Sequence, residues 1–237
     1  MRFTHTLAPA LAALAALGAA SAAHAQSIPV QNFSFESPTV PANPGYTTNV
    51  ITGWNGGGGA GFSTGDFGVQ SLAAGPALFP SGIPDGAQYA YINAGFIYQD
   101  TGTVLTAGAT YTLTAYVGKR TDKPNAAGSL SLDSFLGGLP AAVLATSGSV
   151  TSASGTFTKY TTTFTASSAQ AGQDLGIVLS NTNSPQQQVN FDDVSLTQTA
   201  APVPEASTTV SLGLLLALGM GGLILSARKK KVTKEAC

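Results

Sequence analysis

Residues 110–117 read TYTLTAYV, and this stretch decides the fold class. Apolar side chains alternate with threonine along most of it. Because successive side chains of a β-strand point to opposite faces, the alternation predicts a strand with one face in a core. β-Branched and aromatic residues also favour strands. We therefore expect an all-β protein.

The same pattern recurs along the chain. Between residues 26 and 200 no stretch shows the 3.6-residue apolar period of an amphipathic helix. Short alternating runs bounded by turn residues occur instead, at 88–93, 96–99, 128–135, 155–164, 175–180 and 189–196. They predict an antiparallel β-sandwich (jelly roll) over residues 26–200. Ala94-Gly95 is expected to turn a hairpin between two of these runs.

The N-terminal residues have the pattern of a secretory signal. Arg2 supplies a positive charge, residues 7–20 are apolar, and Ala23-His24-Ala25 has the small-x-small form of a cleavage site. We expect a signal peptide at 1–25, followed by the exported β-sandwich domain.

A second hydrophobic segment follows the predicted sandwich. Residues 206–227 carry no charge, and a helix of this length can cross a membrane. We place a single transmembrane helix at 209–227. By the positive-inside rule, the basic tail 228–237 stays in the cytoplasm, held there by Arg228, Lys229, Lys230 and Lys231.

The order of the C-terminal features resembles a known sorting signal. Val203-Pro204-Glu205, one spanning segment and a basic cluster resemble the PEP-CTERM signal of Gram-negative bacteria, over residues 201–237 with the motif at 203–206. Ala206 stands where a second proline is typical. The resemblance implies an exosortase, a membrane-embedded peptidase that cuts near the motif. The protein would be anchored transiently in the bacterial inner membrane and then lie in the cell envelope or outside the cell.

The composition excludes several kinds of chemistry. His5 and His24 lie in the predicted signal peptide, and the single cysteine is Cys237. The expected exported domain therefore lacks the residues of His-based triads, Cys nucleophiles, ordinary zinc sites, haem and disulfides. No organic cofactor is expected. Residues 26–202 hold nine acidic and four basic residues, a balance that disfavours nucleic acid as a partner.

Several motifs together resemble the galactose-binding-like jelly rolls, a fold that many carbohydrate-binding modules share. They are NFSFESP (32–38), PDGAQYAYI (84–92), LTAGATYTLTAYV (105–117), KYTTTFTA (159–166) and VNFDDVSL (189–196). The resemblance spans nearly the whole expected domain, and it implies that the domain binds sugar.

Three aromatic residues are candidates for sugar stacking. Trp54 precedes a glycine run, and Tyr89 and Tyr91 alternate along one run, so the two tyrosines share a face. The alternative is that all three fill the core of the sandwich.

The pair Asp192-Asp193 is a candidate metal site. The apolar positions change parity between Phe191 and Val194, which predicts a β-bulge at the two aspartates. A carboxylate turned inward there is costly unless it is paired, and a hard cation such as Ca²⁺ suits it. The jelly-roll resemblance implies that Glu36 joins the pair at a structural calcium. Alternatively, the aspartates cap the bulge through backbone N–H groups.

The function expected from the sequence is that of a non-catalytic envelope or extracellular-matrix protein that binds polysaccharide. A structural or adhesive matrix protein without a discrete ligand is the alternative. A glycoside hydrolase is the third and least favoured hypothesis. Such an enzyme needs two carboxylates, and Asp66, Asp85 and Asp100 lie near predicted loops.

Overall fold

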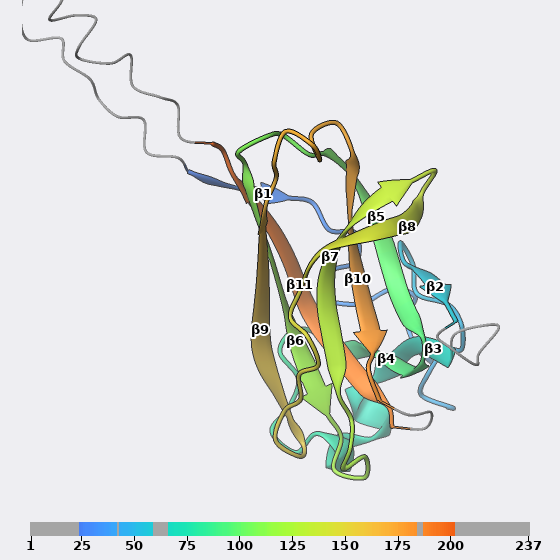
Figure 1. The fold of residues 1–237 in the computed structure, drawn as a ribbon. Helices are drawn as coiled ribbons and strands as arrows, with labels where there is room; N and C mark the ends of the chain where they lie inside the picture. Colours follow the sequence, from blue (N-terminus) through green and yellow to red (C-terminus); the bar gives the residue numbers. More distant parts are fainter. Residues whose placement is uncertain (1–23, 42, 59–65, 184–186, 202–237) are drawn as a thin grey trace, which may run out of the picture. The chain divides into compact units, whose positions relative to one another are not determined.

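Two antiparallel β-sheets face each other across a common core (Figure 1). The structure is a computed structural model, and it describes residues 24–41, 43–58, 66–183 and 187–201. The predicted all-β antiparallel sandwich is confirmed. Within the described ranges, no helix is long and apolar enough to span a membrane. The predicted transmembrane helix and most of the predicted signal peptide lie outside these ranges.

The six-stranded sheet has the order β3-β4-β11-β6-β9, with β1 paired to β11. Its strands are β1 (Ala25–Ile28), β3 (Asp66–Ser71), β4 (Gln88–Ala94), β6 (Thr110–Lys119), β9 (Thr156–Thr165) and β11 (Val189–Thr199). Two short 3₁₀ helices, η1 (Leu72–Ala74) and η2 (Pro76–Leu78), follow β3 in the chain.

The five-stranded sheet has the order β2-β5-β10-β7-β8. Its strands are β2 (Asn55–Gly57), β5 (Phe96–Val104), β7 (Gly128–Leu136), β8 (Leu139–Thr146) and β10 (Asp174–Asn181). The alternating runs all form strands. The edge strand β8 was not predicted, because its sequence LPAAVLAT is rich in alanine and contains proline, which are both depleted in strands.

The predicted hairpin at Ala94-Gly95 is wrong. Strand β4 belongs to the six-stranded sheet and β5 to the five-stranded sheet, so the chain passes from one sheet to the other at this point. Gly95 has a φ of +82°, which glycine adopts without steric cost. Ile92 and Ile97 on its two sides are both fully buried, and each faces the core from its own sheet. Alternation specifies a strand but not its partner.

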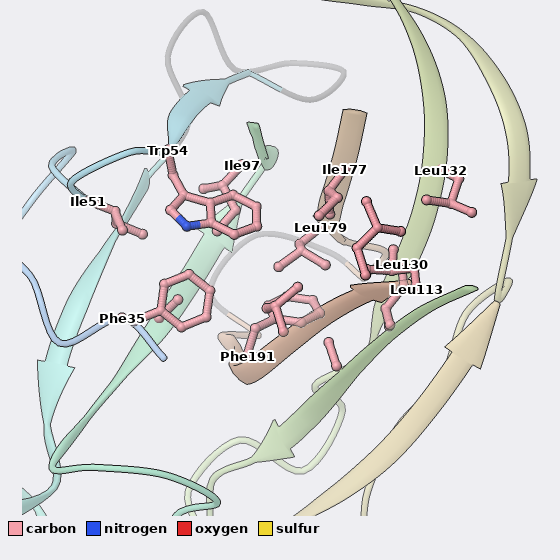
Figure 2. Close-up of a cluster of buried hydrophobic side chains, with 14 of the residues drawn as sticks. Phe35, Ile51, Trp54, Ile97, Leu113, Leu130, Leu132, Ile177, Leu179 and Phe191 are labelled. Carbon is pink, nitrogen blue, oxygen red and sulfur yellow. The ribbon is translucent and has the colours of Figure 1, made fainter. Parts of the chain in front are cut away.

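The core lies between the sheets and joins residues from both (Figure 2). On β6, Tyr111, Leu113 and Ala115 are fully buried, as the alternation in residues 110–117 predicts. From the five-stranded sheet, side chains of β7 and β10 meet them, including Leu130, Leu132, Ile177 and Leu179. The inner faces are thus filled, and any site for a ligand has to be sought on the outer faces or in the loops.

Candidate active site

The outer face of the five-stranded sheet carries a row of charged and aromatic residues. Asp133 on β7 pairs with Gly176 on β10, and Gly176 pairs on its other side with Asp100 on β5. In the next row, Val178 pairs with Tyr98. Residues paired across antiparallel strands share a face. These side chains therefore gather on the side of the sheet that faces away from the core.

The sheet is irregular where this row crosses it. The pairing of β10 with β5 shifts between Leu175 and Gly176. The pairing of β7 with β8 shifts between Leu132 and Asp133, and again between Ser134 and Phe135. β-Bulges bend strands and re-aim side chains, and they occur often beside active sites. Three such irregularities surround Asp133.

Three aromatic rings line the same face. The ring centroid of Tyr98 lies 6.0 Å from that of Phe96 and 6.0 Å from that of Phe135. The Phe135 ring occupies the space above Gly176, where a Cβ would lie 2.1 Å from the nearest ring atom. Glycine at position 176 is therefore required for the ring to lie over β10 and close to Asp133.

Asp133 is the unusual group on this face. The residue is 6% exposed, and its Oδ1 accepts no hydrogen bond from any described residue. Burial raises the pKa of Asp133, and the Ser131 hydroxyl opposes part of this rise. Where the chain is described, the one ion pair joins Arg120 and Asp122, so no cation lowers the pKa of Asp133. Its carboxyl can thus carry a proton at a higher pH than an ordinary aspartate.

We call this surface the acid face and define it by Phe96, Tyr98, Ser131, Asp133, Phe135, Gly176 and Val178. Asp100 is not included, because its Oδ1 accepts a hydrogen bond from the N–H of Gly102 at 2.9 Å. A carboxylic acid that holds its proton can donate it to a substrate, and neighbouring aromatic rings favour a cation that forms beside them. The acid face can therefore support proton-initiated chemistry on an apolar molecule.

Sequence reasoning missed the acid face. In GSLSLDSF, Asp133 has the parity of Ser129 and Ser131, which is the pattern of a solvated outer face. Phe135, two residues on and of the same parity, is the signal that this face is not simply solvated. The contribution of Tyr98 depends on a pairing between distant strands.

The predicted metal ligands Glu36 and Asp192 are brought to the same short segment. Glu36 Oε1 accepts hydrogen bonds from the N–H groups of Ala87 and Gln88 at 2.8 and 2.9 Å. Asp192 Oδ2 accepts one from the N–H of Asp85 at 3.1 Å. The two carboxylates thus both bind the backbone of residues 85–88. The described residues contain no cluster of three or more His, Cys, Asp or Glu side chains suited to a metal.

The predicted bulge at the two aspartates is confirmed. The pairing of β11 with β6 shifts between Asp192 and Ser195, and Asp193 has a φ of +46°. Asp192 is fully buried, and its Oδ1 accepts a hydrogen bond from the N–H of Asp193 at 2.8 Å. Burial raises the pKa of Asp192 to about 8, against the effect of its two backbone hydrogen bonds. Asp193 lines a surface groove beside Phe33 and Ile28.

Trp54 lies in the core. It is 5% exposed, its Nε1 donates a hydrogen bond to the carbonyl of Gln31 at 3.0 Å, and its ring lies 5.4 Å from that of Phe35 (Figure 2). The buried ring has no open face on which a sugar could stack. This placement agrees with the alternative that Trp54 fills the sandwich.

Tyr89 and Tyr91 share the outer face of the six-stranded sheet, but both are buried. Tyr89 is fully buried against the rings of Phe79 and Phe157. The Tyr91 hydroxyl donates a hydrogen bond to the carbonyl of Thr47 at 2.6 Å. Neither presents a stacking platform. The sorting motif Val203-Pro204-Glu205 and the basic residues 228–231 lie outside the described residues.

Comparison with known proteins identifies relatives of the whole β-sandwich. The family model described as HpiC1-like, HpiC1 cyclase, matches residues 26–197. A Stig cyclase, Fisc, from Fischerella sp. TAU in complex with (3Z)-3-(1-methyl-2-pyrrolidinylidene)-3H-indole is 26% identical, with a TM-score of 0.63 over 75% of this chain and 100% of that chain. A cyclase from the same organism, in complex with 4-(1H-indol-3-yl)butan-2-one, is 26% identical, with a TM-score of 0.60 over 75% of this chain and 100% of that chain. Comparison with curated proteins gave no match.

These findings correct the function expected from the sequence. A non-catalytic polysaccharide-binding or adhesive matrix protein was predicted, and the relatives are cyclases. The prediction was wrong because one β-sandwich fold can support unrelated functions, so resemblance in fold does not specify a ligand. The comparisons indicate no organic cofactor. Since the family model covers most of the sequence, the chain belongs to the HpiC1-like cyclase family.

Proposed function

We propose that this protein is a small-molecule cyclase and that the acid face is its active site. One observation carries the proposal: a buried carboxyl, Asp133, with an unpartnered oxygen and a raised pKa, lies on the same face as Tyr98 and Phe135. The two relatives from Fischerella sp. TAU hold indole compounds. An indole with an unsaturated side chain fits an apolar, aromatic face with one acid.

The proposed reaction begins with proton transfer. Asp133 gives its proton to a carbon–carbon double bond of the substrate, so an O–H bond breaks, a C–H bond forms and a carbocation remains. The π electrons of the indole ring attack this cation and form the new ring bond. The Asp133 carboxylate then removes a proton from the cyclised cation, which restores the indole and the acid. Substrate and product are isomers, so no oxidant or reductant is needed.

The aromatic residues have a separate role in this proposal. Tyr98 and Phe135 present rings to the position where the cation forms, and cations are attracted to ring faces. Their apolar surface also keeps water from the cation, which would otherwise give an alcohol in place of a new ring.

Binding and turnover test the acid face separately. We expect 4-(1H-indol-3-yl)butan-2-one to bind the purified full chain, and Phe135→Leu to weaken binding. With 3-alkenyl indoles as substrates, mass spectrometry after chromatography should reveal products of unchanged mass. Asp133→Asn should lower turnover by 100-fold or more, in the range of a lost general acid (~10²–10⁴), with Asp100→Asn as the matched control. Equal turnover in Asp133→Asn and the native protein would refute the assignment.

We propose in addition that the sandwich is a jelly roll. The support is that consecutive strands alternate between the two sheets at several points, for example at Gly95, and that the first and last strands, β1 and β11, are paired. Both features are typical of jelly rolls.

We also propose that Glu36 and Asp192 hold a structural calcium ion. Two carboxylates that converge on residues 85–88 match the oxygen ligands that calcium prefers, and backbone carbonyls and water would supply the rest. Gly86 has a φ of +63°, and a Cβ there would lie 2.1 Å from Glu36 Oε1, so the segment fits closely around the carboxylate. A bound cation would favour the ionised form of Asp192.

Thermal unfolding tests the calcium proposal. The melting temperature in millimolar calcium should exceed that in EDTA, because only the folded chain brings the ligands together. Glu36→Gln and Asp192→Asn should remove this difference, and Asp193→Asn, the matched control, should leave it. No difference between calcium and EDTA in the native protein would leave the backbone N–H contacts as the whole role of these carboxylates.

For the two ends of the chain we propose export and exosortase sorting. The support is the order of an N-terminal signal pattern at 1–25, the Val203-Pro204-Glu205 motif, the apolar segment 209–227 and the basic cluster 228–231. The protein would be anchored transiently in the inner membrane and then reach the envelope or the exterior. In the native host, mass spectrometry should find mature chains that end near residue 205. Glu205→Ala should reduce processing, and Glu235→Ala in the tail is the control.

A further inference from the structure

A cavity lies on the outer face of the six-stranded sheet. It has a volume of about 460 Å³ and is bordered by Tyr46, Asp66, Tyr91, Asn93, Arg120 and Gln188. Asp66 lies on β3, Tyr91 and Asn93 lie on β4, and Gln188 immediately precedes β11. A volume of this size is in the range of sites for small molecules. We call it the outer pocket; the acid face lies on the opposite sheet.

The arginine of the outer pocket is already paired. Arg120 Nε and Nη2 donate to the two carboxylate oxygens of Asp122 at 2.9 and 2.8 Å. Its Nη1 donates to Gln188 Oε1 at 2.7 Å, and Gln188 in turn donates to Gln70 Oε1 at 3.2 Å. The charge of Arg120 is therefore balanced, and four of its five N–H donors have partners among the described residues. This residue holds the amides in place and does not offer an unpaired charge to an anion.

The carboxylate of the outer pocket is not balanced in this way. Asp66 Oδ2 accepts a hydrogen bond from the neutral Asn93 Nδ2 at 3.0 Å. Among the described residues the single ion pair is Arg120–Asp122, so no cation accompanies Asp66. Of the two charged residues that border the cavity, Arg120 is neutralised by Asp122, which leaves the charge of Asp66 without a counter-ion. The outer pocket therefore favours a cation.

The exposed ring of Tyr46 borders the outer pocket together with this carboxylate. Tyr46 is 45% exposed and meets Tyr91 edge to face, with ring centroids 6.4 Å apart and an interplanar angle of 86°. The Tyr91 hydroxyl is fixed by the carbonyl of Thr47. An exposed ring next to a carboxylate attracts an organic cation, since the ring face and the carboxylate both favour positive charge.

We propose that the outer pocket binds a small organic cation: a protonated amine whose ammonium group contacts Asp66 and whose apolar part lies against Tyr46. This site is separate from the acid face and does not depend on the proposed cyclase activity. It would let an amine bind, as a ligand or regulator, while the acid face holds its own substrate.

Calorimetric titration of the purified full chain tests this proposal with three probes of similar shape. Phenethylammonium chloride should bind, and neutral 2-phenylethanol and anionic 3-phenylpropionate should bind at least about tenfold more weakly, as expected for loss of a hydrogen bond to a charged group. Asp66→Asn should weaken the ammonium probe by a similar factor without changing the alcohol. Tyr46→Leu should weaken the binding of both phenethylammonium and 2-phenylethanol.

Matched variants locate the binding. Asp133→Asn, on the opposite sheet, should leave phenethylammonium binding unchanged, and loss of binding in this variant would place the amine on the acid face and overturn the proposal. Asp122→Asn leaves Arg120 unpaired, so it should weaken the ammonium probe and strengthen 3-phenylpropionate. Circular dichroism should show that Asp66→Asn is folded. Equal affinity of this folded variant and the native protein for phenethylammonium would also overturn the proposal.

Discussion

Trp54→Ala tests the position of the single tryptophan. The side chain is 5% exposed, packs on Phe35 and donates a hydrogen bond from Nε1 to the carbonyl of Gln31. Truncation removes these contacts and leaves a cavity between the sheets, so the free energy of unfolding should fall by about 3–5 kcal/mol. The Gln31 carbonyl keeps a second donor, Gln99 Nε2 at 3.0 Å, so the loss of packing contributes most of this cost.

Urea unfolding of the full chain measures this loss. With an m-value of about 2 kcal/mol/M, a loss of 4 kcal/mol lowers the midpoint by about 2 M. Trp54→Phe keeps a ring and loses the hydrogen bond, so it should cost about 1–2 kcal/mol. Leu136→Ala is the surface control, since Leu136 is 78% exposed and its truncation should change stability by less than about 0.5 kcal/mol. A loss below about 1 kcal/mol for Trp54→Ala would refute the core assignment.

Two further predictions concern the acid face, and a third concerns the segment that Gln88 holds. Because the acid form of Asp133 donates the proton and burial raises its pKa, turnover should be full at low pH and fall as pH rises through that raised pKa; a rate that increases with pH would contradict this role. Gly176→Ala should displace the Phe135 ring, which would meet the new Cβ at 2.1 Å, and should weaken indole binding in fluorescence titrations; unchanged binding would contradict a role of this ring in the site. Gln88→Leu should cost about 2–3 kcal/mol in urea unfolding, because it unpairs the backbone groups of Val40 and Phe35 that Gln88 binds; a cost near zero would show that this segment is held by other contacts.

The sequence by itself determined the fold class and most strands. In residues 110–117 the alternation of Tyr111, Leu113 and Ala115 with threonine places one face inward whichever strand lies beside it, because the two-residue period is a local property of the extended chain. The change of parity between Phe191 and Val194 indicated the bulge at Asp192 for the same local reason.

The tertiary structure decided which strands are neighbours, and with them the candidate active site. Asp133, Gly176 and Tyr98 are far apart in sequence and meet because β10 lies between β7 and β5. Local alternation predicts that Asp133 leaves the core, but it does not predict that Phe135 covers Gly176 beside it. The burial that raises the pKa of Asp133 comes from those neighbours, so its proposed chemistry depends on strand order, which local sequence does not specify.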